Sequence, residues 1–159
     1  MFQFIENSKM RSFIAFALLI VATQAKLDPE LVQELMEKLT EAAAKCGEKI
    51  KPSSEDISKL LSHKVPDSTE GRCMLLCVNQ ELGFEKEDGS IDFENGKIIM
   101  DKVKDSDPEI FNKLFEVYKK CSQTDYIVKD DPCETSANLA TCGIKGAEEE
   151  GISFDLGSM

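Results

Sequence analysis

Apolar residues recur three or four positions apart along most of the chain after residue 26, and this period predicts amphipathic helices. After Asp28, for example, Val32, Leu35, Leu39 and Ala43 share one helix face. The predicted helices cover residues 28–47, 53–61, 68–82, 91–103, 107–121 and 131–144. No segment between them carries a confident strand pattern, so the sequence predicts an all-α fold of six helices.

Three of these helices begin with an Asp-Pro pair, at 28–29, 107–108 and 131–132. The aspartate accepts hydrogen bonds from N–H groups of the first turn, and proline fits the first helical position because its missing N–H would have no partner there. Ser68 is a cap of the same kind for the third helix. These signals predict where four of the six helices start.

The helix over 68–82 is predicted to be the centre of the fold. It carries Cys73 and Cys77, which are four positions apart and therefore lie on the same face. Two such cysteines are poorly placed to bond to each other, because their Cβ atoms point the same way. We therefore expect each to bond to a different element, so that this helix is tied to two other parts of the chain.

The first 25 residues have the pattern of a secretory signal peptide. Lys9 and Arg11 precede an apolar run over 12–22, and small residues at 23 and 25 suit cleavage after Ala25. The run is too short to span a bilayer, and no second long apolar run follows. We expect a secreted protein of residues 26–159, a single domain, that does not insert into membranes.

The last segment, 143–159, is rich in Gly and Glu before Ile152, Phe154 and Leu156 alternate with polar residues. This period of two is typical of extended chain. Two interpretations stay open: a loose terminus, or an extended segment that lays these apolar side chains into a groove.

Composition narrows the possible partners. The net charge is −11, which argues against nucleic acid or an anionic membrane as a partner held by a basic patch. Six cysteines, all after the cleavage site, indicate a disulfide framework in a secreted chain, although the residues alone leave most pairings open. The single histidine and the absence of paired CxxC motifs argue against a metal site, and we expect no cofactor.

The sequence also lacks the signals of an enzyme. It contains no Gly-x-Ser-x-Gly nucleophile motif, and its cysteines are expected to be oxidised. A domain of this size does not need three crosslinks to close its core, so these bonds either add durability or hold the walls of a cavity. Flexible methionines at 36, 74 and 100 would suit an adaptable apolar lining, and they also suit an ordinary core.

The full cysteine pattern, Cys46-x26-Cys73-x3-Cys77-x43-Cys121-x11-Cys133-x8-Cys142, resembles that of the insect odorant-binding proteins of the pheromone- and general-odorant-binding type. The x3 and x8 gaps are the most constant features of that family, and the resemblance covers the whole mature chain. It implies a disulfide-stapled bundle of six helices that encloses a hydrophobic pocket. It also implies the pairs Cys46–Cys77, Cys73–Cys133 and Cys121–Cys142.

The resemblance implies a carrier that reversibly binds small hydrophobic molecules, odorants or pheromones, and transports them through aqueous sensory lymph to membrane receptors. Positions that line the pocket in the family fall on Leu39, Leu75, Asn79, Phe115 and Tyr118. Helical periodicity and the tail pattern add Leu61, Met100, Phe111 and Phe154. Asn79 and Tyr118 are the expected polar contacts of a ligand, whereas ordinary core packing is the alternative for each apolar position.

Some members of that family release ligand at acid pH. Here the expected gate consists of His63, between the second and third helices, and Asp155 in the tail, with residues 152–156 covering or entering the pocket. We expect a monomer or a weak homodimer, with an olfactory receptor in a membrane as a further partner.

Other functions remain open at this stage. The same scaffold serves outside olfaction as a carrier or scavenger of other small ligands, which tissue expression would separate. A helical secreted signalling protein without a pocket is a different class, and a lipid-interacting protein of the saposin type has other cysteine spacing.

Overall fold

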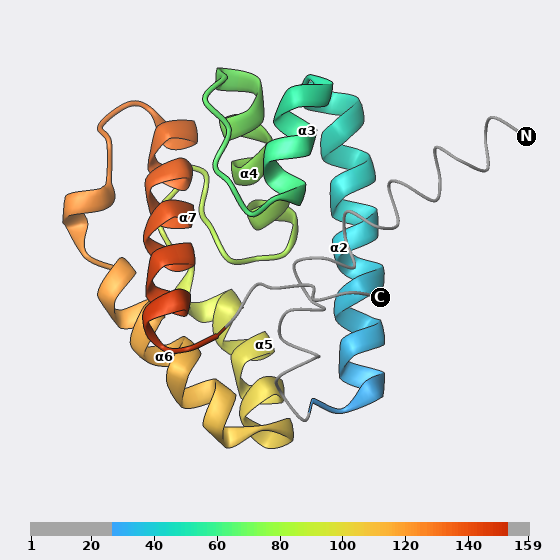
Figure 1. The fold of residues 1–159 in the computed structure, drawn as a ribbon, viewed down its shortest axis with the longest axis vertical. Coiled ribbons are helices and arrows are strands. Elements are labelled where there is room, and N and C mark those ends of the chain that lie inside the picture. The colour runs from blue at the N-terminus through green and yellow to red at the C-terminus, as the bar shows by residue number, and fades with distance from the viewer. Residues whose placement is uncertain (1–26, 153–159) are drawn as a thin grey trace, which may run out of the picture.

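The computed structural model describes residues 27–152, which form six α-helices and one short 3-10 helix (Figure 1). The elements are α2 (Pro29–Ile50), α3 (Ser54–Leu61), α4 (Thr69–Glu81), α5 (Phe93–Ser106), α6 (Pro108–Cys121), η1 (Thr124–Tyr126) and α7 (Pro132–Glu149). The one β feature in this part of the chain is an isolated antiparallel bridge between Glu85 and Ile91. The predicted all-α fold of six helices is therefore confirmed.

The Asp-Pro pairs start helices as predicted. The side chains of Asp28, Asp107 and Asp131 accept hydrogen bonds from N–H groups in the first turns of α2, α6 and α7. In each helix a proline stands in the first turn, where no N–H partner is lost. These starts depend only on local residues, which explains why the sequence locates them well.

The end of α7 differs from the prediction. The helix continues past Ile144 to Glu149, although Gly143 and Gly146 lie within it. A Cβ atom built on Gly146 would lie 2.9 Å from Cγ1 of Val117 on α6. Gly146 therefore lets α6 and α7 approach closely, and it does not end the helix.

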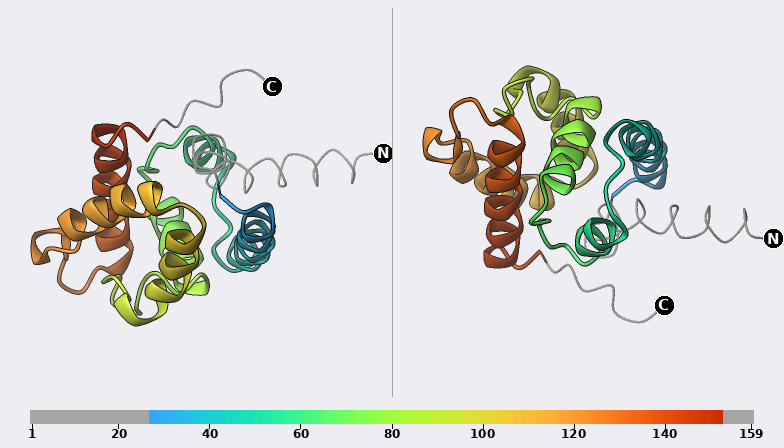
Figure 2. Two further views of the ribbon diagram at one scale, coloured as in Figure 1. Left: turned by 90° about the horizontal axis from the view of Figure 1, so that it is seen from below. Right: turned by 90° about the horizontal axis from the view of Figure 1, so that it is seen from above.

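Helix α4 lies between α2 and α7, and it also contacts α3 (Figures 1 and 2). Helices α5 and α6 pack against each other, and α6 also packs on α7. Three disulfides join α2 to α4, α4 to the first turn of α7, and α6 to α7: Cys46–Cys77, Cys73–Cys133 and Cys121–Cys142. These are the pairs that the resemblance implied, and they tie α4 to two other elements.

The buried apolar residues form separate clusters. The lower cluster joins the first half of α2 to α5, α6 and the end of α7, and it consists of Leu31, Leu35, Val103, Ile110, Ala147 and Ile152. The upper cluster surrounds the Cys46–Cys77 disulfide and includes Met74. These two clusters lie toward opposite ends of α2, with Leu39 between them in the sequence. Within residues 27–152, no helix is long and apolar enough to cross a membrane.

Candidate functional site

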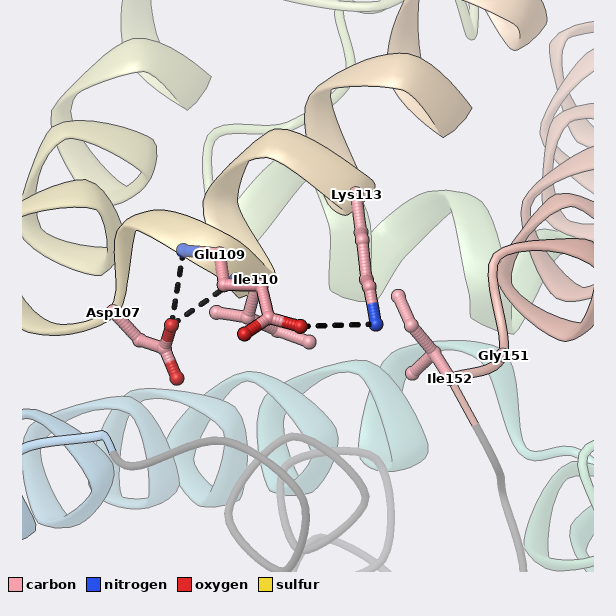
Figure 3. Close-up of a pocket in the computed structure, with 6 residues that line it drawn as sticks. All are labelled: Asp107, Glu109, Ile110, Lys113, Gly151 and Ile152. Atoms are coloured by element: carbon pink, nitrogen blue, oxygen red, sulfur yellow. Dashed lines mark hydrogen bonds and ion pairs between the residues drawn. The ribbon is translucent and has the colours of Figure 1, made fainter.

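A pocket of about 140 Å³ opens between the beginning of α6 and the end of α7 (Figure 3). It is lined by Asp107, Glu109, Ile110, Lys113, Gly151 and Ile152. Ile110 and Ile152 belong to the lower cluster, so the pocket reaches that part of the core. Ligand pockets usually enclose about 300–1,000 Å³, so this one alone is too small for a complete ligand of that kind.

The turn after α7 builds one wall of this pocket. Gly151 has φ +70°, and its N–H donates to the Glu148 carbonyl at 3.0 Å. The N–H of Ile152 donates to the Ala147 carbonyl at 2.9 Å, which completes a Schellman cap. This turn directs the Ile152 side chain into the lower cluster, where it is 2% exposed. Of the expected tail segment, Phe154 and Asp155 lie outside the described residues.

The other predicted lining residues do not border this small pocket. Most of them are half-buried, on α2 to α6: Leu39, Leu61, Leu75, Asn79, Met100, Phe111 and Tyr118. Phe115, in contrast, is 41% exposed. Their contacts with a ligand remain predictions.

Leu39 has the most informative position among them. It lies on the inward face of α2, because Leu35, Ala42 and Cys46, three to seven positions away, are all buried. Leu39 is nevertheless only half-buried. Met100 has the same relation on α5, since Gly96 and Val103 are buried beside it. Both side chains therefore adjoin buried positions and retain some accessible surface.

Four aromatic rings form a ladder on α5 and α6. The ring centroids of Phe111 and Phe115 are 5.7 Å apart, and those of Phe115 and Tyr118 are 6.4 Å apart. Phe93 meets Tyr118 edge-on at 4.8 Å, and Phe93 is 52% exposed. The ammonium of Lys119 lies 5.4 Å from the centroid of the Phe115 ring. This ladder therefore has an outer edge in contact with solvent.

The most buried aliphatic residues of α6 differ from the residues predicted to line a pocket, although Phe111 packs against the lower cluster. Ile110 and Val117 are the buried aliphatic residues of this helix, and neither belongs to the predicted set of Phe111, Phe115 and Tyr118. Both sets are apolar and both have helical spacing, so periodicity alone cannot choose between them. Packing against the neighbouring helix decides which of the two sets is buried, and here Val117 of α6 lies against Gly146 of α7.

Glu85 is a buried carboxyl group that sequence reasoning missed. It follows α4, is 8% exposed, and accepts a hydrogen bond from Nδ2 of Asn79 at 2.8 Å. Burial raises the pKa of Glu85 to about 7, and the nearby side chains of Ser136 and Asn79 offset part of this effect. The predicted polar contact Asn79 is thus engaged by a neighbouring acid.

The turn after Glu85 explains its burial. The backbone at Glu85 bridges to Ile91, and Gly89 lies at φ +79° between them. A Cβ atom built on Gly89 would lie 2.5 Å from the Pro132 carbonyl oxygen, so the turn rests against the start of α7. Nothing in the sequence pattern indicated this contact, because a Glu among Lys, Asp and Gly residues is typical of an exposed turn.

His63 is the one member of the expected gate that lies within the described residues. It is half-buried in the connection between α3 and α4, with φ 53°. Burial lowers the pKa of His63, so more acid than usual is needed to protonate it. Its partner in the expected gate, Asp155, is outside the described residues, so the gate itself remains a prediction.

The described residues contain neither a free thiol nor a metal-ligating cluster. All six cysteines are in disulfides, and no group of three potential metal-ligating side chains occurs within residues 27–152. What the described residues provide is apolar surface with a few polar groups at its borders.

Comparisons with known proteins agree with this description. The model of the PBP/GOBP family matches residues 28–146. General odorant-binding protein 19d of Drosophila melanogaster is 25% identical over 134 residues, which cover 84% of this chain and 86% of the relative. General odorant-binding protein 28a of the same species is 24% identical over 120 residues, which cover 76% and 82%.

Two solved structures share the fold. Odorant-binding protein 28a of Drosophila melanogaster has a TM-score of 0.63 at 24% identity, covering 76% of this chain and 98% of that one. A pheromone-binding protein of the cockroach Leucophaea maderae, in complex with the fluorescent reporter ANS, has a TM-score of 0.55 at 14% identity, covering 69% and 92%. The PBP/GOBP family comprises secreted carriers without enzymatic activity. Because its model spans most of this chain and the helices and disulfides agree, the protein belongs to the PBP/GOBP family of insect odorant-binding proteins.

Proposed function

We propose that this protein binds small hydrophobic molecules reversibly in the interior of the helix bundle. The observation that carries the proposal is the family match over residues 28–146. The ANS complex of the cockroach relative supports it, since that ligand is an aromatic reporter. We place the ligand beside Leu39 and Met100, which are half-buried next to buried positions of α2 and α5.

We further infer that the protein works outside the cell and carries its ligand through aqueous fluid to a membrane receptor. Three disulfides favour an oxidising compartment. Residues 1–25 have the pattern of a signal peptide. A ligand held only by hydrophobic contacts forms no covalent bond with the protein and can dissociate again. Such reversible binding suits a carrier.

The test uses the mature chain, residues 26–159, and the uncharged fluorophore N-phenyl-1-naphthylamine. We expect saturable fluorescence enhancement and displacement by small apolar molecules. Leu39→Trp should fill the inner space and weaken probe binding, whereas Ile98→Trp, at a position that is 61% exposed on α5, should not. The absence of saturable binding would refute the proposed function.

Delivery to a receptor is tested separately. Receptor-expressing cells should respond to a displacing ligand at lower total concentration when the wild-type protein is present than when Leu39→Trp is present. Equal responses would leave binding intact and refute delivery.

A further inference from the structure

The three disulfides differ in how far they are shielded from solvent. Four cysteines have exposed fractions of 0–7%, and they form two of the bonds, Cys46–Cys77 and Cys121–Cys142. The remaining bond joins Cys73 of α4 to Cys133 of α7, and both of these residues are only half-buried. Exposed disulfides are the ones that thiols reduce most readily.

The packing around each bond explains this difference. Met74 and other apolar side chains of the upper cluster surround one shielded bond, and Val117 and Tyr126 pack on the other. Neither Cys73 nor Cys133 belongs to a buried apolar cluster of residues 27–152. The chain that leads into Cys133 is also open to solvent, since residues 129–131 are exposed.

The two sulfurs of the half-buried bond differ as leaving groups. Cys133 lies in the first turn of α7, directly after Pro132, whereas Cys73 lies one turn further into α4. The unpaired N–H groups of a first helical turn stabilise a thiolate. A thiol should therefore attack Sγ of Cys73, because Cys133 then leaves as the better stabilised thiolate.

The charged groups around this bond nearly cancel. Arg72, which precedes Cys73, forms an ion pair with Glu134, which follows Cys133. Asp131, the N-cap of α7, adds a negative charge at the same helix end and offsets part of its effect on a thiolate.

We propose that Cys73–Cys133 is a thiol-modification site, which a small thiol opens in the folded protein while the other two disulfides stay closed. The thiolate of the small molecule forms a bond to Sγ of Cys73, the bond between the two protein sulfurs breaks, and Cys133 keeps the electron pair. A second thiolate then attacks the small-molecule sulfur of the mixed disulfide and releases Cys73. Two thiols are thereby oxidised to one disulfide, and their protons pass to the two cysteines.

Opening this bond separates two covalently linked pairs of helices. It is the one disulfide between α4 and α7, so α4 stays linked to α2, and α7 stays linked to α6. Its cysteines are 60 positions apart, compared with 31 and 21 for the other bonds. Because it closes the longest loop, its reduction should lower the thermal midpoint and speed hydrogen exchange in the first turn of α7.

The experiment treats the folded mature chain, residues 26–159, with 2-mercaptoethanol, an uncharged thiol. Samples taken over time are blocked with iodoacetamide, and the peptides are mapped by mass spectrometry. We expect Cys73 and Cys133 to be released about tenfold faster than the other four cysteines, with the early mercaptoethanol adduct on Cys73. Equal release of all six cysteines, or earlier loss of another bond, would refute the proposal, and an adduct mainly on Cys133 would overturn the direction of attack.

One charge substitution tests the role of the helix end. Asp131→Asn keeps an N-cap and removes the negative charge beside Cys133, so it should speed reduction about threefold. The matched control is Asp107→Asn at the N-cap of α6, whose first turn contains no cysteine. It should leave the rate unchanged. Equal rates in the two variants would refute the assignment of Cys133 as the leaving group.

A variant without the bond gives a second check. Cys73→Ala combined with Cys133→Ala keeps the two shielded disulfides and should release almost no thiol at the same dose of 2-mercaptoethanol. Thiol release at the wild-type rate would contradict the proposed order. The wild-type peptide map decides the proposal alone if circular dichroism shows that this variant is not folded.

Discussion

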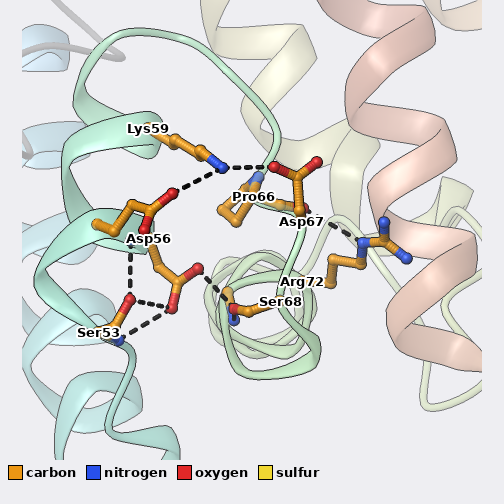
Figure 4. Close-up of polar contacts among 9 residues, drawn as sticks. Ser53, Asp56, Lys59, Pro66, Asp67, Ser68 and Arg72 are labelled. Atoms are coloured by element: carbon orange, nitrogen blue, oxygen red, sulfur yellow. Dashed lines mark hydrogen bonds and ion pairs between the residues drawn. The ribbon is translucent and has the colours of Figure 1, made fainter.

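The hydroxyl of Ser68 donates a hydrogen bond to Oδ1 of Asp56, and this contact joins the start of α4 to α3 (Figure 4). Ser68 is also the N-cap of α4, because its Oγ accepts from the Gly71 N–H at 2.9 Å. The other oxygen of Asp56 accepts from the backbone and the hydroxyl of Ser53, the N-cap of α3. One carboxyl group therefore holds the capping residues of two helices together.

This corner leaves no room for a side chain at Gly71. A Cβ atom there would lie 2.3 Å from Cβ of Pro66 and 2.7 Å from Oδ1 of Asp56. We expect Gly71→Ala to lower the free energy of unfolding by about 2 kcal/mol through overpacking, measured by urea denaturation. Gly47→Ala on α2 meets nothing within 4 Å and should raise it by about 0.5–1 kcal/mol. Equal stability of the two variants would contradict the close packing at this corner.

Glu85 should make stability fall as pH rises. Its pKa is raised from 4.5 to about 7 in the folded state, so the folded protein binds this proton more tightly than the unfolded chain. Stability is then highest below about pH 4.5 and falls toward pH 7, by about 3 kcal/mol for a shift of this size. At acid pH this contribution of Glu85 stabilises the fold, and it therefore opposes the effect of any group whose protonation destabilises the fold.

The measurement is urea denaturation across this pH range. Glu85→Gln should give a flatter profile than wild type, because it removes the titrating group and keeps an amide of similar shape. Glu87→Gln, at an exposed position in the same turn, should keep the wild-type slope. A wild-type slope in Glu85→Gln would show that another group causes the pH dependence.

The end of α7 predicts different results for two truncations. A chain that ends at Gly146 loses Ala147 and Ile152 from the lower cluster and should be destabilised by about 3 kcal/mol or more. A chain that ends at Ser153 keeps both and should unfold within about 0.5 kcal/mol of wild type. Thermal unfolding followed by circular dichroism distinguishes them, and equal losses would contradict the seating of Ile152.

The chain that ends at Ser153 also tests the predicted pH gate. If residues 154–159 cover or enter the binding site, the chain ending at Ser153 should lose the difference in probe affinity between about pH 7 and pH 5. If it keeps the wild-type difference, the tail plays no part, and His63→Gln becomes the next variant to test.

The face of α6 can be checked by two substitutions. Val117 is 9% exposed, so Val117→Ala should lower stability by about 2 kcal/mol. Phe115 is 41% exposed, so Phe115→Ala should cost less than about 1 kcal/mol despite the larger side chain removed. Chemical denaturation of both variants decides the point, and the opposite order would place the aromatic ladder inside.

Local signals made much of this fold predictable. The Asp-Pro caps and the cysteine spacing act over short stretches or through covalent geometry, so the helix starts and the central position of α4 followed from the residues. The end of α7 was predicted too early, because Gly146 lets α7 approach Val117 of α6 and does not end the helix. Val117 is more than twenty positions away in the sequence. Glu85 escaped notice for the same reason, since its burial depends on Gly89 resting against α7.

The disulfides divide the helices into two kinds. The disulfides link four of them in series, α2 to α4, α4 to α7 and α7 to α6, whereas α3 and α5 carry no disulfide. Local opening of the native state should therefore favour α5, whose outer side is mostly exposed. Small molecules would then exchange with the interior through transient outward motion of this helix, while the four linked helices keep their places and no global unfolding is needed.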